Sequence, residues 1–279
     1  PSHLYTTSGN FTVSVVSIAG NCRDSVSKVV TVNALPLVDA GLDSTICTGT
    51  SITIGGVPTG PLGSSYTWTP NATLDDDTLS NPTASPTLSP TVYTVTVTDS
   101  NGCINADSVT ISLHNLPVLV TNADTSICIG SCTPMSVTGA LSYLWTPSAG
   151  LSDTTIFNPV ACPTQTTTYT VEGTDVNGCI DTASVTVTID PLPLVDAGVD
   201  AAICIGDTIV LGGSPTGPTG TSYVWTPAAT LNNDTISNPV ATPLVTTDYV
   251  VTITDTNGCV SMDTVTITVN ALPLVDAGL

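Results

Sequence analysis

The sequence predicts an all-β protein that is built as a tandem array of antiparallel β-sandwich domains. Apolar and β-branched residues alternate with Thr and Ser over short stretches, as they do in half-buried strands. Gly, Pro and Asn-Gly turn signals separate these stretches, and no segment has the period or the caps of a helix. The whole pattern recurs at intervals of 81, 76 and 80 residues, measured between the Leu-Pro pairs that begin at Leu35, Leu116, Leu192 and Leu272.

These intervals define the expected domain organisation. We expect the C-terminal part of a truncated repeat at 1–34, complete repeats at 35–115, 116–191 and 192–271, and the start of a further repeat at 272–279. The partial repeats are too short to complete one another, so we interpret the chain as a segment of a longer array. A strand donated by another molecule could instead complete the first repeat.

The first complete repeat shows how the elements follow one another. The extended segment "LPLVDAGLDSTIC" leads to strands in "TSITIGG" and "SSYTWTP", where Tyr66 and Trp68 share a face because side chains alternate along a strand. A loop-rich stretch with prolines suited to edges and turns follows. The hairpin "YTVTVTDSNGCINADSVTISL" closes the repeat, and its Asn101-Gly102 tip accepts the positive φ values of a tight turn. About seven short strands per repeat are typical of a sandwich.

A "WTP" motif places one tryptophan in the third strand of each repeat, at Trp68, Trp145 and Trp225. We expect these side chains to pack between the two sheets of the sandwich. Stacking against a bound ligand is the alternative function for them.

The opening "HLYTTSGNFTVSVVSIAGNC" resembles the end of a PKD domain, whose pattern H-x-Y-x-x-x-G-x-Y-x-V is matched with Phe11 in place of the second Tyr. The complete repeats, through "AGLDSTICTG", "YTWTP", "NPTASPT" and "YTVTVTDSNGC", resemble the Ig-like and PKD-like tandem repeats of large secreted Bacteroidota proteins, including gliding-motility-associated surface proteins. The resemblance implies immunoglobulin-like sandwiches that are exported and displayed at the bacterial cell surface. It implies no activity, because this fold hosts many functions.

The charge distribution excludes several classes of function. The formal net charge is −20, and the only basic residues are Arg23 and Lys28. Nucleic acids and anionic membrane surfaces need cationic residues that this chain lacks, so neither is an expected partner. No apolar run approaches the ~20 residues of a membrane span, so we expect no membrane insertion in this segment. The two histidines, His3 and His114, do not recur with the repeat, and we expect no enzymatic activity.

The nine cysteines follow the repeat closely. "IC-x-G" contains Cys47, Cys128 and Cys204; "NGC" contains Cys103, Cys179 and Cys259; "GNC" contains Cys22; and the middle repeat alone adds Cys132 and Cys162. No spacing resembles a zinc site. In an exported array of small domains, disulfides are the expected state.

Two pairings of the recurring cysteines remain open. In an immunoglobulin-like sandwich, "IC-x-G" and "NGC" lie at opposite ends, about 25 Å apart, whereas a disulfide needs Cα atoms within about 7 Å. This geometry favours pairing with the next repeat, Cys47 with Cys179 and Cys128 with Cys259, and it leaves Cys22, Cys103 and Cys204 for other repeats. Cys132 and Cys162 would pair inside the middle repeat. A shorter or shifted sandwich would instead allow pairing within each repeat, as in Cys47 with Cys103.

Calcium is the one cofactor that the sequence suggests. Oxygen-bearing side chains gather where the hairpin tips and the linkers meet, and such clusters suit calcium. The residues are Asp39, Asp99, Asn101, Asp175, Asn177, Asp196, Asp255 and Asn257. The alternative is that Asp and Asn serve only as turn formers.

A recurring Asp-Ser/Thr tripeptide looks like the O-glycosylation acceptor motif of Bacteroidota. The acceptor hydroxyls would be those of Ser25, Ser44, Thr78, Ser108, Thr154, Thr182, Thr208, Thr235 and Thr264. A chain rich in Asp and Thr also contains such tripeptides by chance.

The sequence favours a structural function. Near-identical repeats, proline-containing linkers and cysteine staples suit a long extracellular filament, stalk or adhesin shaft. Its partners would be the neighbouring repeats of the same chain and identical chains in a filament. The alternative is an Ig-like module that binds a glycan or a protein through its loops. The loops "VPTGPLGSSYTWTPNATL" and "SPTGPTGTSYVWTPAATL" are nearly repeated, which favours the shaft.

Overall fold

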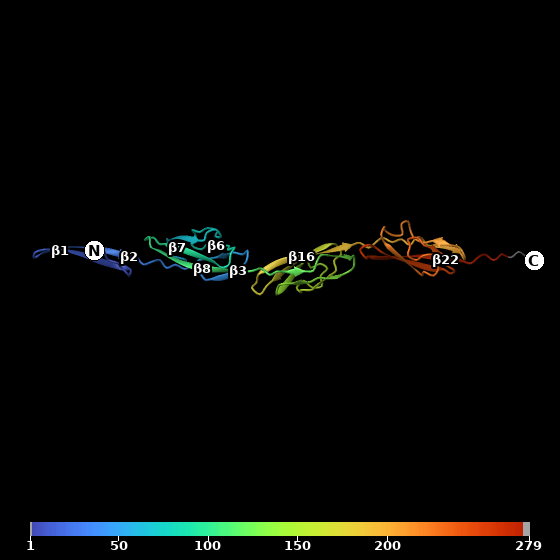
Figure 1. Ribbon diagram of the computed structural model, residues 1–279, viewed down its shortest axis with the longest axis horizontal. Helices are drawn as coiled ribbons and strands as arrows, with labels where there is room; N and C mark the ends of the chain where they lie inside the picture. The colour runs from blue at the N-terminus through green and yellow to red at the C-terminus, as the bar shows by residue number, and fades with distance from the viewer. Residues whose placement is uncertain (1, 276–279) are drawn as a thin grey trace, which may run out of the picture. The chain divides into compact units, whose positions relative to one another are not determined.

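The computed structural model describes residues 2–275, and every regular element in that range is a strand (Figure 1). Over the described residues, no helix meets the length and hydropathy that crossing a membrane requires. The chain divides into two compact units, one reaching Pro117 and including Asp175–Cys179, the other containing Val118–Thr174 and continuing from Ile180. The end of the expected partial repeat 272–279 lies outside the described residues.

The N-terminal element of the first unit is a two-stranded antiparallel hairpin. It consists of β1 (Gly9–Ala19) and β2 (Cys22–Val32), paired from Gly9 opposite Val32 to Ala19 opposite Cys22. The rings of His3 and Tyr5 lie 4.6 Å apart, and those of Tyr5 and Phe11 lie 4.5 Å apart. The residues of the PKD-like pattern therefore form an aromatic cluster beside β1.

The rest of the first unit is dominated by one sandwich. Its strands are β3 (Ser44–Cys47), β4 (Ile52–Thr53), β5 (Ser65–Thr69), β6 (Thr83–Ala84), β7 (Thr91–Thr98) and β8 (Ile104–His114). The larger sheet has the order β3-β8-β7-β5, in which β3 runs parallel to β8 and the other pairs are antiparallel. The smaller sheet pairs β4 with β6, and an isolated bridge joins Leu74 to Ala84. Six strands form where about seven were expected, because much of the loop-rich stretch stays irregular.

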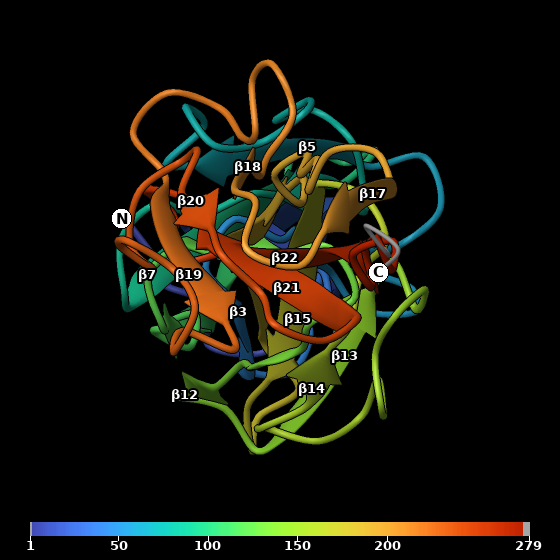
Figure 2. The same cartoon turned by 90° about the vertical axis from the view of Figure 1, so that its right-hand side faces the viewer.

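The second unit contains two further sandwiches with the same sheet order. The first has β9 (Val120–Thr121), β10 (Thr125–Cys128), β11 (Thr133–Pro134), β12 (Val137–Thr138), β13 (Ser142–Thr146), β14 (Val160–Ala161), β15 (Thr167–Thr174) and β16 (Ile180–Asp190). The second has β17 (Ala201–Cys204), β18 (Ile209–Val210), β19 (Ser222–Thr226), β20 (Val240–Ala241), β21 (Thr247–Thr254) and β22 (Val260–Asn270). Figure 2 shows β19, β21 and β22 side by side, in the sheet order β17-β22-β21-β19.

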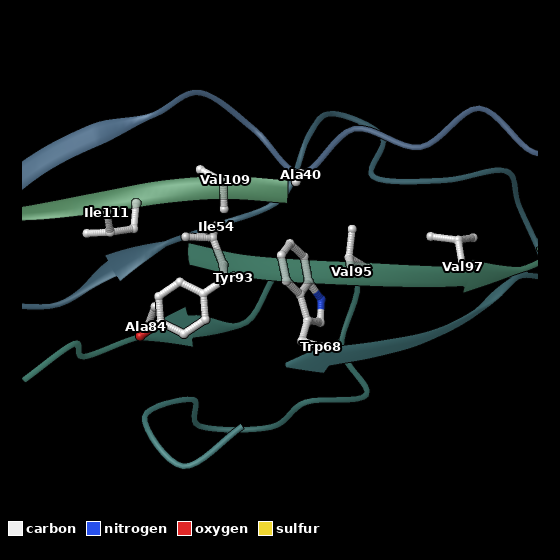
Figure 3. Packing of buried hydrophobic residues seen from close by; sticks show 9 residues of the cluster. All are labelled: Ala40, Ile54, Trp68, Ala84, Tyr93, Val95, Val97, Val109 and Ile111. Atoms are coloured by element: carbon white, nitrogen blue, oxygen red, sulfur yellow. The ribbon is translucent and has the colours of Figure 1, made fainter. Parts of the chain in front are cut away.

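Each sandwich has its own hydrophobic core. In the first, Trp68 and Tyr93 are fully buried among Val95, Ile111 and Ile54 (Figure 3). The equivalent tryptophans, Trp145 and Trp225, are 1 % and 0 % exposed. The three cores lie within the ranges expected for the complete repeats, whose boundaries stay a prediction.

The burial of the tryptophans decides their role. The indole Nε1–H of Trp68 donates to the carbonyl of Leu79 at 3.0 Å, and the other two indoles make the same bond to Ile156 and Ile236. A side chain with this exposure has no face on which a ligand could stack, so the ligand-stacking alternative is wrong. The packing of these indoles between the sheets is confirmed.

An aspartate fixes the start of the parallel strand in all three sandwiches. Asp43 Oδ1 accepts a bond from the backbone N–H of Thr110 at 2.7 Å, and Asp124 and Asp200 accept the same bond from Thr186 and Thr266 at 2.8 Å. Each acceptor comes just before the strand that leads to "IC-x-G". This bond sets the register in which the following cysteine reaches the end of the sheet.

Candidate functional site: the cysteine turns and their disulfides

The "D-x-N-G-C" stretches form one turn, built in the same way three times. In the first, Asp99 Oδ1 accepts bonds from the backbone N–H groups of Asn101 and Cys103, both at 2.8 Å. The N–H of Asp99 donates to the carbonyl of Cys103 at 3.0 Å, and Gly102 takes a φ of +80°. Asp175 and Asp255 cap their turns with the same two bonds.

The type of turn differs from the sequence-based expectation. Asn-Gly was expected to take positive φ values at the hairpin tip, yet among the described residues only glycines have positive φ. Strand β7 ends at Thr98 and β8 begins at Ile104, so five residues lie between them. The capping aspartate supplies the backbone contacts that a two-residue turn would have made, and Asn101 keeps a negative φ.

In the first two of these turns the geometry also lowers the pKa of the capping aspartate. The bond from the backbone N–H of Cys103 is the main reason that the pKa of Asp99 lies below its ordinary value. Burial acts to raise the pKa of Asp175, but hydrogen bonds from the backbone N–H groups of Cys179 and Asn177, with a smaller electrostatic contribution from the nearby His114, bring it below the ordinary value. These carboxylates are therefore ionised acceptors at neutral pH.

The second kind of cysteine ends the parallel strand. Cys47 is the last residue of β3 and pairs with His114, the last residue of β8. The next turn is closed by bonds from Thr48 N–H to the His114 carbonyl at 2.9 Å and from Thr50 N–H to the Cys47 carbonyl at 3.1 Å. Cys128 and Cys204 end β10 and β17 in the same way, opposite Asp190 and Asn270.

Of the two pairings that the sequence left open, the structure has the one with the following repeat. Cys47 is bonded to Cys179 and Cys128 to Cys259, each with Cα atoms 5.5 Å apart. Cys179 and Cys259 are 1 % and 0 % exposed, so the bonded cysteines are buried although the tip residues before them are exposed. Asp175–Cys179 accordingly belongs to the first unit, the one that contains Cys47.

The remaining cysteines fall into two groups. Cys132 and Cys162 are bonded to each other with Cα atoms 4.2 Å apart, beside the pairing of Thr133 with Ala161. The thiols of Cys22, Cys103 and Cys204 are free. Cys103 is half-buried, whereas its bonded counterparts Cys179 and Cys259 are fully buried.

The calcium hypothesis stays a prediction. Asp39 Oδ1 accepts from Gly41 N–H and Asp196 Oδ1 from Gly198 N–H, both at 2.9 Å, so the linker acids also serve their own backbone. The structure brings Asp99 and Asn101 together in one turn, where Asn101 Nδ2 lies 3.4 Å from Asp99 Oδ2. Across residues 2–275, no three His, Cys, Asp or Glu side chains converge as they would around a metal ion. The contacts that are present are those of turn formers.

The candidate glycosylation hydroxyls differ in accessibility. Seven lie on exposed residues, namely Ser25, Thr78, Ser108, Thr182, Thr208, Thr235 and Thr264. Ser44 and Thr154 are half-buried, and the Ser44 hydroxyl donates to the Leu42 carbonyl at 3.1 Å. Modification at these positions stays a prediction.

Sequence reasoning missed an asparagine clamp in the "NP" dipeptide. Asn81 Nδ2 donates to the carbonyls of Ile54 and Gly56 at 3.4 and 3.1 Å. Asn238 makes the same bonds to Leu211 and Gly213 at 3.1 and 3.2 Å. The signal in the sequence is the Asn-Pro dipeptide itself, which recurs at Asn81, Asn158 and Asn238.

Comparisons with known proteins show little beyond the fold. No protein-family model matches the sequence, and no curated protein matches it. An I-band fragment of titin is similar at a TM-score of 0.42 and 12 % identity, covering 86 % of this chain and 100 % of that one. The insect immune protein hemolin is similar at a TM-score of 0.31 and 15 % identity, covering 88 % and 79 %. At these scores the likenesses add nothing to the sheet topology, which shows immunoglobulin-like β-sandwiches in tandem.

Proposed function

We propose that this chain is a segment of an extracellular structural shaft, in which each repeat is locked covalently to the next. The observation that carries the proposal is the overlap of two disulfide loops. The bond from Cys47 to Cys179 spans 132 residues, and the bond from Cys128 to Cys259 spans 131. The two loops share residues 128–179.

The overlap has a mechanical consequence. A single break in the backbone anywhere between residues 47 and 259 falls inside at least one closed loop, so the two parts stay joined. Each bond also restricts the unfolded chain, by about 4–5 kcal/mol for a loop of this length in the chain-entropy model. A spacer exposed to shear and proteases gains from both effects.

The composition supports an exposed setting. Disulfides persist in oxidising compartments, and a net charge of −20 with two basic residues keeps such arrays soluble and apart from one another. The exposed Asp-Ser/Thr tripeptides suit a glycosylated surface. Display on a bacterial cell surface, a gliding-motility setting and lateral assembly of identical chains rest on the sequence resemblance alone.

The covalent lock can be tested with the purified, oxidised chain. An Asp-directed protease is required, because the last tryptic site follows Lys28. Peptide mapping without reduction should find Cys47 linked to Cys179 and Cys128 linked to Cys259. Chains cut once between residues 47 and 259 should run as one species without reductant and as two with it. Small-angle scattering should show an elongated particle, about 40 Å per repeat for strands of this length.

A matched variant tests whether the disulfides are what keeps the cut chain joined. In Cys128→Ser/Cys259→Ser, a single cut between residues 179 and 259 should release a fragment even without reductant, while cuts between 47 and 179 should not. Linkage of Cys47 to Cys103 in the mapped protein would overturn the covalent lock. A compact particle in scattering would overturn the shaft.

A further inference from the structure

The N-terminal hairpin of β1 and β2 corresponds to the last two strands of a complete repeat. Phe11 pairs with Val30 in the hairpin, as Tyr93 pairs with Val109 between β7 and β8. The same pairing of a tyrosine with a valine occurs between β15 and β16 and between β21 and β22. This shared pair aligns the four hairpins residue by residue.

One face of the N-terminal hairpin is exposed, although the same face is buried in the complete repeats. Val13 and Val15 share this face because side chains alternate along β1, and Val26 pairs with Val15 across it. These three side chains are 42, 62 and 70 % exposed, respectively. Their counterparts in β7, Val95 and Val97, are 0 % exposed. An exposed apolar face of this kind indicates a surface that another element covers.

The backbone of β1 is also free along its outer edge. Within residues 2–275, the sheet that contains β1 has β2 as its only other strand, whereas β7, β15 and β21 are paired on both sides. An isolated two-stranded sheet is marginally stable, and a long apolar edge is a template for a further strand. The hairpin therefore offers both an apolar face and a row of unpaired backbone groups.

In the complete repeats, the strand that carries the tryptophan occupies this edge. Its tryptophan stands opposite the valine that comes two residues after the buried tyrosine, as in Figure 3, where Trp68 lies beside Val95. The three pairs are Trp68 with Val95, Trp145 with Val171 and Trp225 with Val251. The equivalent valine of β1 is Val13. A tryptophan strand on the outer edge of β1 would therefore place its indole beside Val13.

The N-terminal segment of a repeat, which also lies on this face, fits the hairpin less well. In the first and third repeats, Asp107 and Asp263 accept a hydrogen bond from that segment. At the same position, opposite Val13, the hairpin has Lys28, whose ammonium group accepts no hydrogen bond. The middle repeat also lacks this contact, because it has Ala183 there. The tryptophan strand is the cover that all three complete repeats share.

The chain's own tryptophan strands are not free to bind the hairpin. Strands β5, β13 and β19 are each paired inside their own sandwich, and their tryptophans are at most 1 % exposed. A second folded copy of the chain has its tryptophan strands in the same state. The strand that covers the hairpin of residues 1–279 must therefore come from a different polypeptide.

We propose that the outer edge of β1 binds an extended strand of the Ser-Tyr-x-Trp-Thr type from another polypeptide. The strand runs antiparallel to β1, with its tryptophan opposite Val13 and its tyrosine opposite Val15. Backbone hydrogen bonds along the edge and burial of the indole provide the recognition. The proposal goes beyond the shaft function, because it adds a non-covalent joint between two polypeptides.

The test uses the oxidised full chain and a synthetic peptide with the sequence of residues 219–229, "TGTSYVWTPAA". The unlabelled peptide is titrated into the isotopically labelled chain while amide shifts are followed by NMR. It should bind saturably with a stoichiometry of one, shift the amides of β1 and β2, and protect alternate β1 amides from hydrogen exchange. Trp225→Ala in the peptide should weaken binding by at least about tenfold, because the buried indole is lost.

The peptide backbone supplies a matched pair of controls. In the third repeat, the N–H of Trp225 donates to the carbonyl of Asp234 at 2.8 Å and not to β21. Because successive N–H groups of a strand point to opposite sides, the N–H of Val224 is the one directed at β21. N-methylation of Val224 should therefore abolish binding to β1, whereas N-methylation of Trp225 should leave it unchanged.

Variants of the hairpin test the face that the tryptophan covers. Val13→Asp should weaken binding of the peptide by at least about tenfold, because the carboxylate would have to be buried under the indole. Val16→Asp introduces the same charge on the opposite face of β1 and should leave the affinity unchanged. The methylated peptides leave the protein unaltered, so they test the proposal even if Val13→Asp unfolds the hairpin.

Four results would overturn the proposal. They are the absence of saturable binding, equal binding of the two methylated peptides, full affinity in a folded Val13→Asp variant, and a dimer of the chain that Val13→Asp abolishes while the peptide does not bind. The last result would assign the face to a second copy of the chain. The disulfide mapping does not depend on the hairpin, so the two proposals can fail separately.

Discussion

The middle repeat holds its N-terminal segment by different means from the repeats on either side of it in the sequence. In the first and third, an aspartate does so: Asp107 Oδ2 accepts from Ala40 N–H at 2.9 Å, and Asp263 Oδ2 from Ala197 N–H at 2.7 Å. The middle repeat has Ala183 at that register position. It instead pairs β9 with β12 and adds the bond between Cys132 and Cys162. The same topology therefore tolerates the exchange of a polar contact for strand pairing and a covalent bond.

The two kinds of repeat also fill one part of the core from different segments of the chain. Tyr66 pairs with Val97 in the first repeat, and Tyr223 pairs with Ile253 in the third. The equivalent Tyr143 of the middle repeat pairs with Gly173. A Cβ on Gly173 would meet a methyl carbon of Leu119 at 2.5 Å. The volume lost from one strand is thus supplied by Leu119 from the N-terminal segment, as close packing requires.

The largest expected difference comes from the extra disulfide. Cys132→Ser/Cys162→Ser opens a loop of 30 residues and should lower the unfolding free energy of the middle sandwich by about 3–4 kcal/mol in the chain-entropy model. Native-state hydrogen exchange should show the loss in β15 amides and leave β7 and β21 unchanged. Equal losses in all three sandwiches would contradict independent cores.

The next largest effect tests the exchange of volume. Gly173→Val should destabilise the middle sandwich by about 1–3 kcal/mol, because the new side chain collides with Leu119 and Ala140. The double variant Gly173→Val/Leu119→Ala should recover part of this loss, since it imitates the first repeat. If the double variant is as unstable as the sum of its parts, Leu119 does not fill the space in question.

A smaller effect is expected from the aspartate contact. Asp107→Ala removes the acceptor for the backbone N–H of Ala40, a fully buried residue. It should lower the free energy of opening measured at the Ala40 amide by about 1 kcal/mol. Asp107→Asn retains an acceptor oxygen and serves as the control. Hydrogen exchange at the Ala40 amide measures the effect of both variants. If Asp107→Ala protects this amide as well as the wild type does, the contact does not hold the N-terminal segment of the first repeat.

These contrasts show what the sequence could and could not predict. The strands, the buried tryptophans and the cysteine-bearing hairpins follow from alternation and spacing, which depend on local residue types. Asp43 was interpreted only as part of a tripeptide, because its partner Thr110 is distant in sequence. The Pro58–Ser64 loop is irregular, and no periodicity encodes its shape. Loops and long-range side-chain contacts were therefore the parts that needed the structure.

The smallest expected effect compares acid sensitivity in the first and third repeats. Asp75 Oδ1 accepts from Thr83 N–H at 2.7 Å, and Asp76 Oδ1 accepts from Thr78 N–H at 2.8 Å. The bond from the Thr83 N–H holds the pKa of Asp75 below its ordinary value. The bonds from the Thr78 hydroxyl and N–H do the same for the pKa of Asp76. In the third repeat Asn232 and Asn233 accept the equivalent bonds from Val240 and Thr235.

Because the folded pKa of each aspartate is lowered, its contribution to stability is present above the unfolded value of about 3.9 and is lost as the pH falls through the folded value. The amides of Thr78 and Thr83 should therefore lose protection from hydrogen exchange below about pH 4, while those of Thr235 and Val240 should not. Asp75→Asn/Asp76→Asn should give the first repeat the flat profile of the third. Parallel acid profiles for the two loops, or a double variant that still loses protection, would place the acid sensitivity elsewhere in the first repeat.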